Sequence, residues 1–333
     1  MDKKDLRNKH LALLRNVVRQ ARVLTKPQAA ELSGLSVVTV NALLQELLAA
    51  GEVLRAEEVS SSGGRPAQQY VYNARHRLAL TVYMHEKAGR DTMFIALQDM
   101  LGNALEKQEL QPEHITIGLF QRVLQPYFAR YRQITAVVVG LPGMEVRGRL
   151  AVIDYPELQN LPFCALLKEA FGCPVYLEND INAAVLGCTA ALGEQGREET
   201  VVGIYLPQNY PPGAGISLRG KVYKGRDGMA GEIGSRLRFW SGDGVISGQG
   251  STMLRRIAEL IVLFAVTWNP HRLILYHERL QTEQLETIRQ LAADRFAQEF
   301  LPELEVKSSI YEDYGRGIAE LAMEYLHEKR NGE

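Results

Sequence analysis

The chain has 333 residues, of which 46% are hydrophobic, and a formal net charge of −1. This length leaves room for two or three domains with a sizeable core, and the three cysteines are odd in number and lack the spacing of a zinc site. No signal-type apolar run follows the charged start, and the longest apolar stretch, residues 261–268, is too short to span a bilayer. The composition therefore favours a reduced, soluble, cytoplasmic protein.

The near-neutral total hides two regions of opposite charge. Residues 1–77 contain 12 Lys/Arg and 7 Asp/Glu, a net charge of +5, whereas residues 78–333 carry −6. A basic region binds nucleic acid by releasing counterions from phosphates, so such binding weakens steeply with salt. The charge distribution indicates a DNA-binding head on an acidic body.

Residues 24–51 read as two short helices joined by a tight turn. Thr25 is placed to cap the first helix, and Pro27 suits its first turn because a proline lacks the N–H that is not needed there. Gly34 allows the left-handed conformation that ends a helix sharply, and Ser36 caps the second helix. This pattern predicts a helix-turn-helix, although a helical hairpin in an ordinary bundle is the alternative.

Apolar spacing predicts which side of each helix faces the core. In the first helix we expect a small apolar face of Ala29, Ala30 and Leu32, and in the second a core face of Val40, Leu43, Leu44 and Leu47. The solvent face of the second helix would then consist of Val37, Val38, Thr39, Asn41, Ala42 and Gln45. This face can hydrogen-bond to base edges, but it contains no Arg or Lys, so we expect it to read guanine poorly.

Two strand-like segments, residues 52–55 and 70–72, follow the second helix and predict a winged helix-turn-helix. The loop between them contains Ser-Ser-Ser-Gly-Gly-Arg-Pro at residues 60–66, with Arg65 as the cation at its tip. Such a tip suits a narrow minor groove, where the negative potential is strongest; a plain solvated turn is the alternative. The DNA contacts expected overall are Lys26, Gln28, Ser36, Val38, Thr39, Asn41, Gln45 and Arg65.

The rest of the chain alternates strand-like and helix-like segments, which predicts an α/β body. Strands are predicted over residues 77–82, 93–98, 104–109, 136–139, 175–177, 200–206, 214–218, 272–276 and 305–309, and helices over 115–131, 163–171, 181–192, 251–267 and 282–299. The repeated strand-helix order suggests two lobes with a cleft between them. We assign 1–73 to the winged head, 74–182 to the first lobe with helix 315–330 packed back on it, and 183–314 to the second lobe.

Three motifs of the body resemble those of the ROK family of repressors, open reading frames and sugar kinases. They are Glu-Asn-Asp-Ile-Asn-Ala-Ala at residues 178–184 followed by Gly187, the glycine-rich segment 221–234, and Gly-Leu-Pro-Gly at 140–143. The head with Gly-Gly-Arg-Pro resembles the repressor branch of that family. The resemblance covers nearly the whole chain and implies a two-lobed actin-like, hexokinase-like (ribonuclease H-like) body with a sugar cleft.

The resemblance also implies roles for individual residues. In family kinases the aspartate that matches Asp180 deprotonates a sugar hydroxyl, and the residues that match Asn179 and Glu232 bind other hydroxyls. Carboxylates and amides suit this task because they accept and donate hydrogen bonds together. We therefore expect ligand contacts from Gly143, Asn179, Asp180, Glu232 and Ser235. The alternative is that Asn179 and Asp180 serve as a cap for the helix at 181–192, a role that Asp180 can fill without binding any ligand.

Three departures from the family concern the nucleotide. The Asp-x-Gly-Gly-Thr phosphate loop of its kinases corresponds to residues 83–92, which lack the glycine pair and the leading aspartate. The second phosphate loop corresponds to residues 207–213, which include three prolines that cannot donate N–H bonds. Residues 276–278 lack the glycines that admit adenosine. We therefore predict no ATP binding, no cofactor, no catalytic residue and no enzyme activity.

The family's zinc site is also changed. Ser235 takes the place of a histidine, and residues 235–250 contain no cysteine or histidine, so we predict no metal. The matching histidine contacts the sugar in relatives, which makes the usual sugar preference a poor guide here. Core packing is the simpler interpretation of Phe239 and Trp240, with a stacking face for the sugar in place of the histidine as the alternative.

Together these patterns predict a sequence-specific DNA-binding transcriptional regulator of carbohydrate metabolism, a repressor whose inactive kinase-like body senses a sugar or sugar phosphate. The alternatives are a sugar kinase that kept a DNA-binding head, and a body that serves only for dimerisation. The expected partners are an operator duplex, the effector and a second copy of the chain, as a homodimer or higher oligomer, without a membrane. Helix 251–267, with the apolar run 261–266, is a candidate for the interface between copies, and a buried core helix is the alternative.

Overall fold

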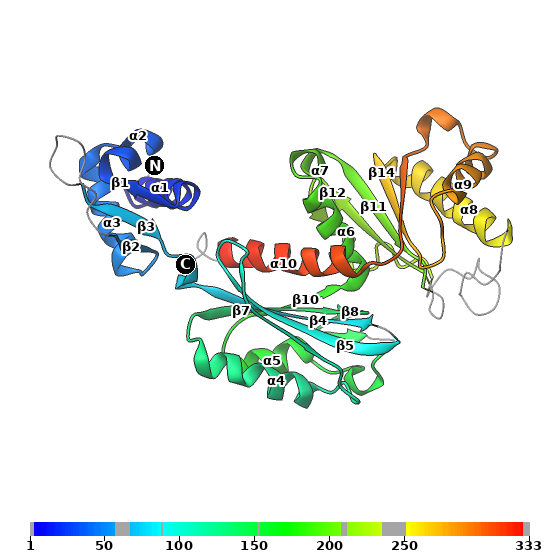
Figure 1. The fold of residues 1–333 in the computed structure, drawn as a ribbon, viewed down its shortest axis with the longest axis horizontal. Helices are drawn as coiled ribbons and strands as arrows, with labels where there is room; N and C mark the ends of the chain where they lie inside the picture. The colour runs from blue at the N-terminus through cyan, green and yellow to red at the C-terminus, as the bar shows by residue number, and fades with distance from the viewer. Residues whose placement is uncertain are drawn as a thin grey trace. The chain divides into compact units, whose positions relative to one another are not determined.

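The computed structural model describes residues 3–56, 67–87, 89–151, 154–207, 212–234 and 251–328. Contacts divide the chain into two compact units. The first, called the head, consists of residues 1–77 and 99–101, and the second, called the body, consists of residues 78–98 and 102–333. Figure 1 shows both units as ribbons.

The head combines three helices with a three-stranded antiparallel sheet. Its elements are α1 (Lys3–Ala21), β1 (Val23–Thr25), α2 (Lys26–Ser33), α3 (Val37–Ala49), β2 (Val53–Arg55), β3 (Gln69–Tyr72) and the 3-10 helix η1 (Ala74–His76). The strands lie in the order β1-β3-β2. Buried side chains from all three helices and all three strands form one core. The sequence patterns did not predict α1 or β1.

Side-chain caps define where α2 and α3 begin. Thr25 accepts a hydrogen bond from the Gln28 N–H and Gln28 accepts one from the Thr25 N–H, which together form a capping box. Gly34 ends α2 at φ 67°, and the Ser36 hydroxyl accepts from the Thr39 N–H at 3.1 Å. The chain bends by 109° between the two helices, within the range of helix-turn-helix pairs.

The apolar spacing of α3 predicted its core face correctly, and that of α2 only in part. Val40, Leu43, Leu44 and Leu47 are all buried. The prediction that Leu32 faces the core is wrong, because its side chain is 60% exposed. Ala29 and Ser33, four residues apart on the same side of α2, are the buried residues instead, because a helix of two turns presents a single narrow stripe to the core.

The first lobe of the body is a five-stranded sheet with helices on its faces. Its elements are β4 (Leu78–Lys87), β5 (Arg90–Asp99), β6 (Ala104–Leu110), α4 (Ile117–Arg130), β7 (Ile134–Leu141), β8 (Met144–Val146), β9 (Arg149–Ala151), η2 (Pro156–Leu158), α5 (Phe163–Phe171) and β10 (Val175–Asn179). The strand order is β10-β7-β4-β5-β6, with β10, β7 and β4 parallel. Figure 1 shows α4 and α5 together on one face, over a continuous apolar core.

The second lobe repeats this plan. Its elements are α6 (Asp180–Ala191), α7 (Glu194–Glu198), β11 (Thr200–Tyr205), β12 (Gly213–Leu218), β13 (Lys221–Val222), α8 (Ser251–Trp268), β14 (Arg272–Tyr276), α9 (Gln284–Ala293), η3 (Gln298–Phe300) and β15 (Glu303–Lys307). The last helix, α10 (Tyr311–Glu328), follows this lobe in the chain and packs back on the first lobe. The strand order is β13-β12-β11-β14-β15. Helices α8 and α9 pack on each other, and their buried side chains join those of the sheet in one core.

The predicted helix over 282–299 is too long, because α9 ends at Ala293. The buried stripe of α9 consists of Ile288 and Ala292 alone, and beyond it the chain turns so that Arg295 pairs with Glu259 of α8 at 3.0 Å. The run 261–266 in α8 is part core and part surface. Most of its side chains face the lobe core, whereas Leu263 and Val266 are exposed.

Helices α6 and α10 connect the two lobes and touch through their backbones. Helix α6 packs on β11 and β12 of the second lobe, whereas α10 packs on β4 and β7 of the first. A Cβ added at Gly317 would lie 1.7 Å from the Ala183 carbonyl oxygen, and one added at Gly187 would lie 1.9 Å from that of Asp313. Glycine is required at both positions because any side chain would separate the helices.

No single helix within the described ranges is long and apolar enough to cross a membrane; the bent pair α2 and α3 passes that test by length and composition alone.

Candidate functional site

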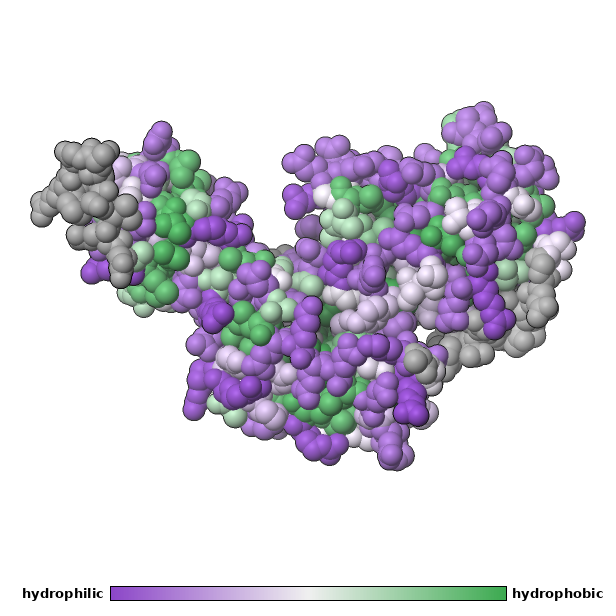
Figure 2. Space-filling model, in the orientation of Figure 1, coloured by the Kyte–Doolittle hydropathy of each residue, from purple (hydrophilic) through white to green (hydrophobic). Residues whose placement is uncertain are grey.

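On the head, the candidate DNA-binding surface is the exposed side of α3. Val38 is 81% exposed, and Val37, Asn41, Ala42 and Gln45 are exposed as well, whereas Thr39 is half-buried. Figure 2 shows hydrophobic as well as hydrophilic surface on the head. An exposed helix face that mixes apolar methyl groups with amide side chains suits contact with thymine methyl groups and adenine edges.

Several residues expected to contact DNA already use their polar atoms within the head. The Gln28 amide oxygen accepts from the Thr25 N–H at 2.9 Å and lies 3.0 Å from the Thr25 hydroxyl. The Ser36 hydroxyl accepts from the Thr39 N–H and lies 2.9 Å from the Thr39 hydroxyl. Lys26 Nζ lies 6.0 Å from the centroid of the Tyr70 ring. These atoms fix the ends of α2 and α3 and leave Asn41 and Gln45 as the main amide donors on the open face.

Sequence reasoning missed a cation beside α3. Arg55, the last residue of β2, is exposed and its guanidinium donates to the Gln45 amide oxygen at 3.5 Å. Because β2 follows α3 after the short turn at Gly51, the end of that strand returns alongside the helix. The short connection between the end of α3 at Ala49 and the start of β2 at Val53 is the sequence feature from which the position of Arg55 beside α3 could have been predicted. Arg65, the expected minor-groove residue, lies outside the described residues.

In the body, the candidate ligand site forms where two parallel strands end. Strands β7 and β10 are neighbours, with Leu141 opposite Asn179, so the Gly-Leu-Pro-Gly turn and the Glu-Asn-Asp motif leave the sheet side by side. The Asn179 amide donates to the Gly143 carbonyl at 3.3 Å. The carboxyl edge of a parallel sheet is the usual position for ligands in α/β proteins.

Asn179 is the cap of α6, as the capping alternative allowed, whereas Asp180, the other residue named for that role, is not. The Asn179 side-chain oxygen accepts from the N–H groups of Ile181 and Asn182. Asp180 is the first residue of the helix and accepts from the Ile181 N–H at 2.7 Å through one carboxylate oxygen. No other residue in the part of the chain that the structure describes donates to the second oxygen of Asp180, which is the natural acceptor for a ligand hydroxyl.

Carboxyl groups gather around Asp180. Burial, followed by the charges of Asp154 and Glu232, raises the pKa of Asp180 to about 7. Burial and the charge of Asp91 raise the pKa of Asp154 to about 6, and the Tyr155 hydroxyl donates to Asp91 at 3.3 Å. Sequence reasoning did not single out Asp91 or Asp154, because neither belongs to a motif and only the fold brings them to Asp180.

Glu178 joins the two lobes beside this cluster. Its buried carboxylate accepts from the Asn179 N–H and the Asn182 amide, and it pairs with Lys224 of the second lobe at 2.8 Å. The segment that carries Glu232 packs against β12, where Gly231 has φ 89° and a Cβ would lie 1.9 Å from the Ala214 carbonyl. That close packing positions Glu232 near Asp180. Ser235, Phe239 and Trp240 lie outside the described residues.

An aromatic cluster takes up the region that corresponds to the first phosphate loop. It consists of Tyr83, His85, Phe94, Tyr311 and Tyr314. The Tyr83 ring stacks on Phe94 with centroids 5.0 Å apart and lies 4.9 Å from that of Tyr314, while His85 stacks on Tyr311 at 5.8 Å. Strands β4 and β5 are hydrogen-bonded neighbours, whereas the pairing of β4 with β7 ends at Tyr83.

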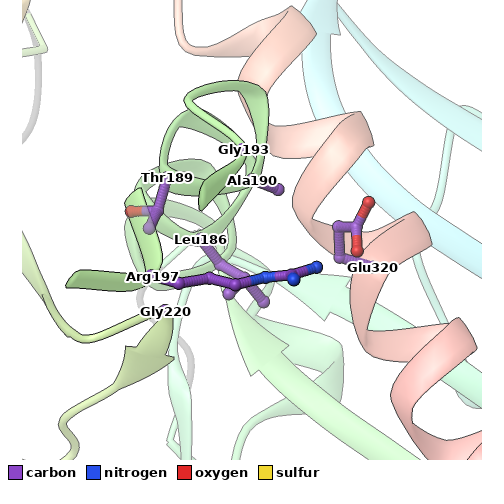
Figure 3. Close-up of a pocket in the computed structure, with 7 residues that line it drawn as sticks. All are labelled: Leu186, Thr189, Ala190, Gly193, Arg197, Gly220 and Glu320. Atoms are coloured by element: carbon purple, nitrogen blue, oxygen red, sulfur yellow. The ribbon is translucent and has the colours of Figure 1, made fainter. Parts of the chain in front are cut away.

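A separate cavity of about 150 Å³ lies at the other end of α6, between α6, α7 and α10 (Figure 3). Its lining residues are Leu186, Thr189, Ala190, Gly193, Arg197, Gly220 and Glu320. Asp180 is not among them, so this cavity is not the site at the motifs. Within the part of the chain that the structure describes, no group of three or more His, Cys, Asp or Glu side chains is arranged to hold a metal ion.

The raised pKa values predict how stability depends on pH. Between about pH 4 and pH 7 the folded chain keeps protons on Asp180 and Asp154 that the unfolded chain has released, so the free energy of unfolding falls as pH rises through this range. Asp180→Asn removes most of this decrease in the free energy of unfolding, because the uncharged amide does not titrate and Asp180 has the larger pKa shift of the two groups. We expect the variant to be more stable than the parent by on the order of 2 kcal/mol at pH 8 and equally stable at pH 4.

Urea unfolding at the two pH values measures this difference, with Asp227→Asn as the control because Asp227 is exposed and paired only with its neighbour Arg226 among the described residues. Equal stability of the parent and Asp180→Asn at both pH values would contradict the raised pKa of Asp180.

Comparisons with known proteins agree with this geometry. Residues 87–238 match the family model described as the ROK family, so the chain contains a ROK family domain. A xylose repressor of Caldicellulosiruptor bescii is 26% identical over 226 residues, covering 64% of this chain and 54% of the relative. The DNA-binding transcriptional dual regulator NagC of Escherichia coli is 24% identical over 233 residues, covering 67% and 56%. The chain thus spans little more than half the length of the curated relatives it matches.

Solved structures share the fold. A ROK family transcriptional regulator, a homologue of the E. coli MLC protein, superposes with a TM-score of 0.64 at 16% identity and covers 98% of each chain. A ROK hexokinase from Thermus thermophilus superposes with a TM-score of 0.59 at 20% identity and covers 76% of this chain and 99% of its own. The body therefore has the α/β fold common to ROK regulators and ROK kinases.

Proposed function

We propose that the chain is a sequence-specific DNA-binding transcriptional regulator, a repressor of carbohydrate metabolism, whose body binds a sugar or sugar phosphate and transfers no phosphate. The observation that carries the proposal is the junction of α2 and α3, a 109° bend that leaves the polar and methyl-rich side of α3 open beside Arg55. The names of the relatives, a xylose repressor and a transcriptional regulator, support the same function.

Arg55 gives a direct test of the DNA-binding surface. An exposed guanidinium beside the recognition helix contributes counterion release and phosphate contact, so Arg55→Ala is expected to weaken binding about tenfold and to reduce the slope of log K against log salt by about 1. Fluorescence anisotropy with DNA selected from a random library measures both quantities. Arg122→Ala removes the same charge from an exposed position of α4 and is the control. Equal losses in the two variants would contradict the proposed surface.

The effector site is proposed at Gly143, Asn179, Asp180 and Glu232, with Ser235 as a further contact. The uncommitted oxygen of Asp180 and the nearby carboxyl of Glu232 favour a ligand that donates several hydroxyl hydrogen bonds. A ligand that binds the native state raises the melting temperature, so D-xylose, D-glucose and N-acetylglucosamine, with their phosphates, are the first panel. The shift is expected to disappear in Asp180→Ala.

The aromatic cluster supports the absence of phosphoryl transfer. Phosphate binding needs exposed backbone N–H groups, whereas here paired strands and stacked rings fill the corresponding region. The alternative, a sugar kinase with a DNA-binding head, is favoured by the fold shared with a ROK hexokinase. Incubation with Mg-ATP and the sugar panel, followed by phosphorus NMR, separates the two. A sugar phosphate formed by the parent and lost in Asp180→Asn would establish the kinase.

A second copy of the chain completes the proposal. One helix-turn-helix reads only a few base pairs, and two-fold operators require paired heads. Leu263 and Val266 of α8, 42% and 62% exposed, are apolar surface suited to a homodimer or higher oligomer. Sedimentation of the parent and of Val266→Asp tests this contribution.

A further inference from the structure

Tyr314 holds a buried hydrogen-bond donor that the fold does not use. Its side chain is fully buried, and its hydroxyl has no hydrogen-bond partner among the described residues. Burying a hydroxyl without a partner is costly, so each such group in a native structure calls for a reason. Neither the apolar core of the first lobe nor the aromatic cluster needs a hydroxyl, since phenylalanine would pack equally well there.

The hydroxyl lies at the motifs of the ligand site. A Cβ added at Gly140, the first residue of the Gly-Leu-Pro-Gly turn, would lie 2.5 Å from the Tyr314 oxygen. Gly140 is paired with Glu178, two residues before Asp180, and after burial the charge of Asp180 contributes most to the raised pKa of Tyr314, so the phenol lies near that carboxyl. Asp180 currently directs one oxygen to the Ile181 N–H. No other described residue donates to its second oxygen, which is the candidate acceptor for the phenol.

The turn of α10 that carries Tyr314 is fixed to the second lobe as well. The neighbouring Asp313 accepts from Tyr276 of β14 at 2.8 Å and from Lys307 of β15 and Arg316 of α10 at 2.7 Å. The α10 backbone also touches α6 through Gly187. A bond between Tyr314 and Asp180 would therefore join both lobes at one point.

We propose that Tyr314 is a positioning residue that couples the Asp180 carboxylate to α10, by donating a hydrogen bond to this carboxylate in part of the ligand-free population and in all of it when a sugar occupies the body. The inference rests on the proposed function and adds its regulation. The vacant donor favours the arrangement in which it is satisfied, and a ligand that binds this arrangement more tightly shifts the population toward it. Sugar binding would thereby change the position of α10 and, with it, the angle between the two lobes.

A double-variant cycle tests the coupling without any ligand. The melting temperatures of the parent, Tyr314→Phe, Asp180→Ala and the double variant are compared at pH 8, where Asp180 is ionised. Coupled residues give a double variant whose shift differs from the sum of the single shifts, whereas independent residues add. Additive shifts overturn the inference. If Asp180→Ala does not fold, the Asp180→Asn series is used, with the same sign of non-additivity required.

A second arm measures regulation with D-xylose and N-acetylglucosamine as the probes. The sugar-induced change in affinity for selected DNA is expected to fall at least fivefold in Tyr314→Phe, while Tyr325→Phe, about three turns along the same helix, keeps the parental response. A full response in Tyr314→Phe overturns the inference and leaves the proposed function intact. If neither sugar changes DNA affinity in the parent, the proposed effectors are wrong, and the ligand-free cycle still decides the role of Tyr314.

Discussion

Replacing Gly317 by alanine will lower the free energy of unfolding of the body by about 3 kcal/mol or more. The added Cβ would lie 1.7 Å from the Ala183 carbonyl oxygen and 2.5 Å from its carbon, both backbone atoms that cannot turn away. Helices α6 and α10 must separate to make room, which disturbs the junction between the lobes. Urea unfolding followed by circular dichroism measures the loss.

Gly118→Ala is the matched control for this prediction. Gly118 is an exposed helical glycine of α4, and the nearest atom to an added Cβ lies 3.7 Å away. Alanine favours helices over glycine by about 1 kcal/mol, so this control should be neutral or slightly stabilising. If Gly317→Ala were as stable as Gly118→Ala, the backbone contact between α6 and α10 would be disproved.

Removing the Asp313 carboxylate is the second change with a large expected effect. Asp313→Ala leaves Lys307 and Arg316 without their shared anion and Tyr276 without its acceptor, and we expect a loss of about 3 kcal/mol. The loss stays below that of a wholly buried pair because the Lys307 and Arg316 side chains are 27% and 40% exposed. Urea unfolding at neutral pH measures it.

The control makes the same substitution in a surface pair. Asp227 contacts Arg226 with both side chains mostly exposed, so Asp227→Ala should change stability by less than about 0.5 kcal/mol. Tyr276→Phe, which removes one donor only, should cost about 1 kcal/mol. A loss in Asp313→Ala no larger than that in Asp227→Ala would show that the network does not hold α10 to the second lobe.

Local sequence patterns predicted the local features of the fold well. The caps at Thr25 and Ser36 and the left-handed Gly34 are visible in three or four consecutive residues, because capping joins neighbours in the chain. The core face of α3 follows from a period of 3.6 residues. Strand β14 and helix α5 were predicted to the residue for the same reason, since apolar runs between turn residues mark their ends.

Features that depend on distant parts of the chain were not predicted. Arg55 reaches α3 only because β2 folds back along it. Asp154 lies near Asp180, and Asp91 near Asp154, only because the segment after β9 meets both β5 and the end of β10. The sequence showed only that residues 83–92 lack the glycine pair of a phosphate loop, and it did not predict that an aromatic cluster forms there. Its rings come from β4, β5 and α10, so no single stretch of sequence contains it.

The two halves of the proposal have different physical bases. DNA binding rests on an open helix face with a nearby cation, whereas the absence of phosphoryl transfer rests on aromatic side chains that fill the region matched to the first phosphate loop. Asp180, with a pKa of about 7, retains the chemistry of a proton acceptor, and without a phosphoryl donor it can serve binding alone. A body of this kind can respond to a sugar and leave it unchanged.

The most direct test is the affinity of the chain for DNA selected from a random library, measured by fluorescence anisotropy with and without the sugar panel. The account predicts binding about 1,000-fold tighter than to a scrambled duplex at physiological salt, and a change of at least about fivefold when one sugar of the panel is added. Equal affinity for selected and scrambled DNA, unchanged by every sugar, would contradict it.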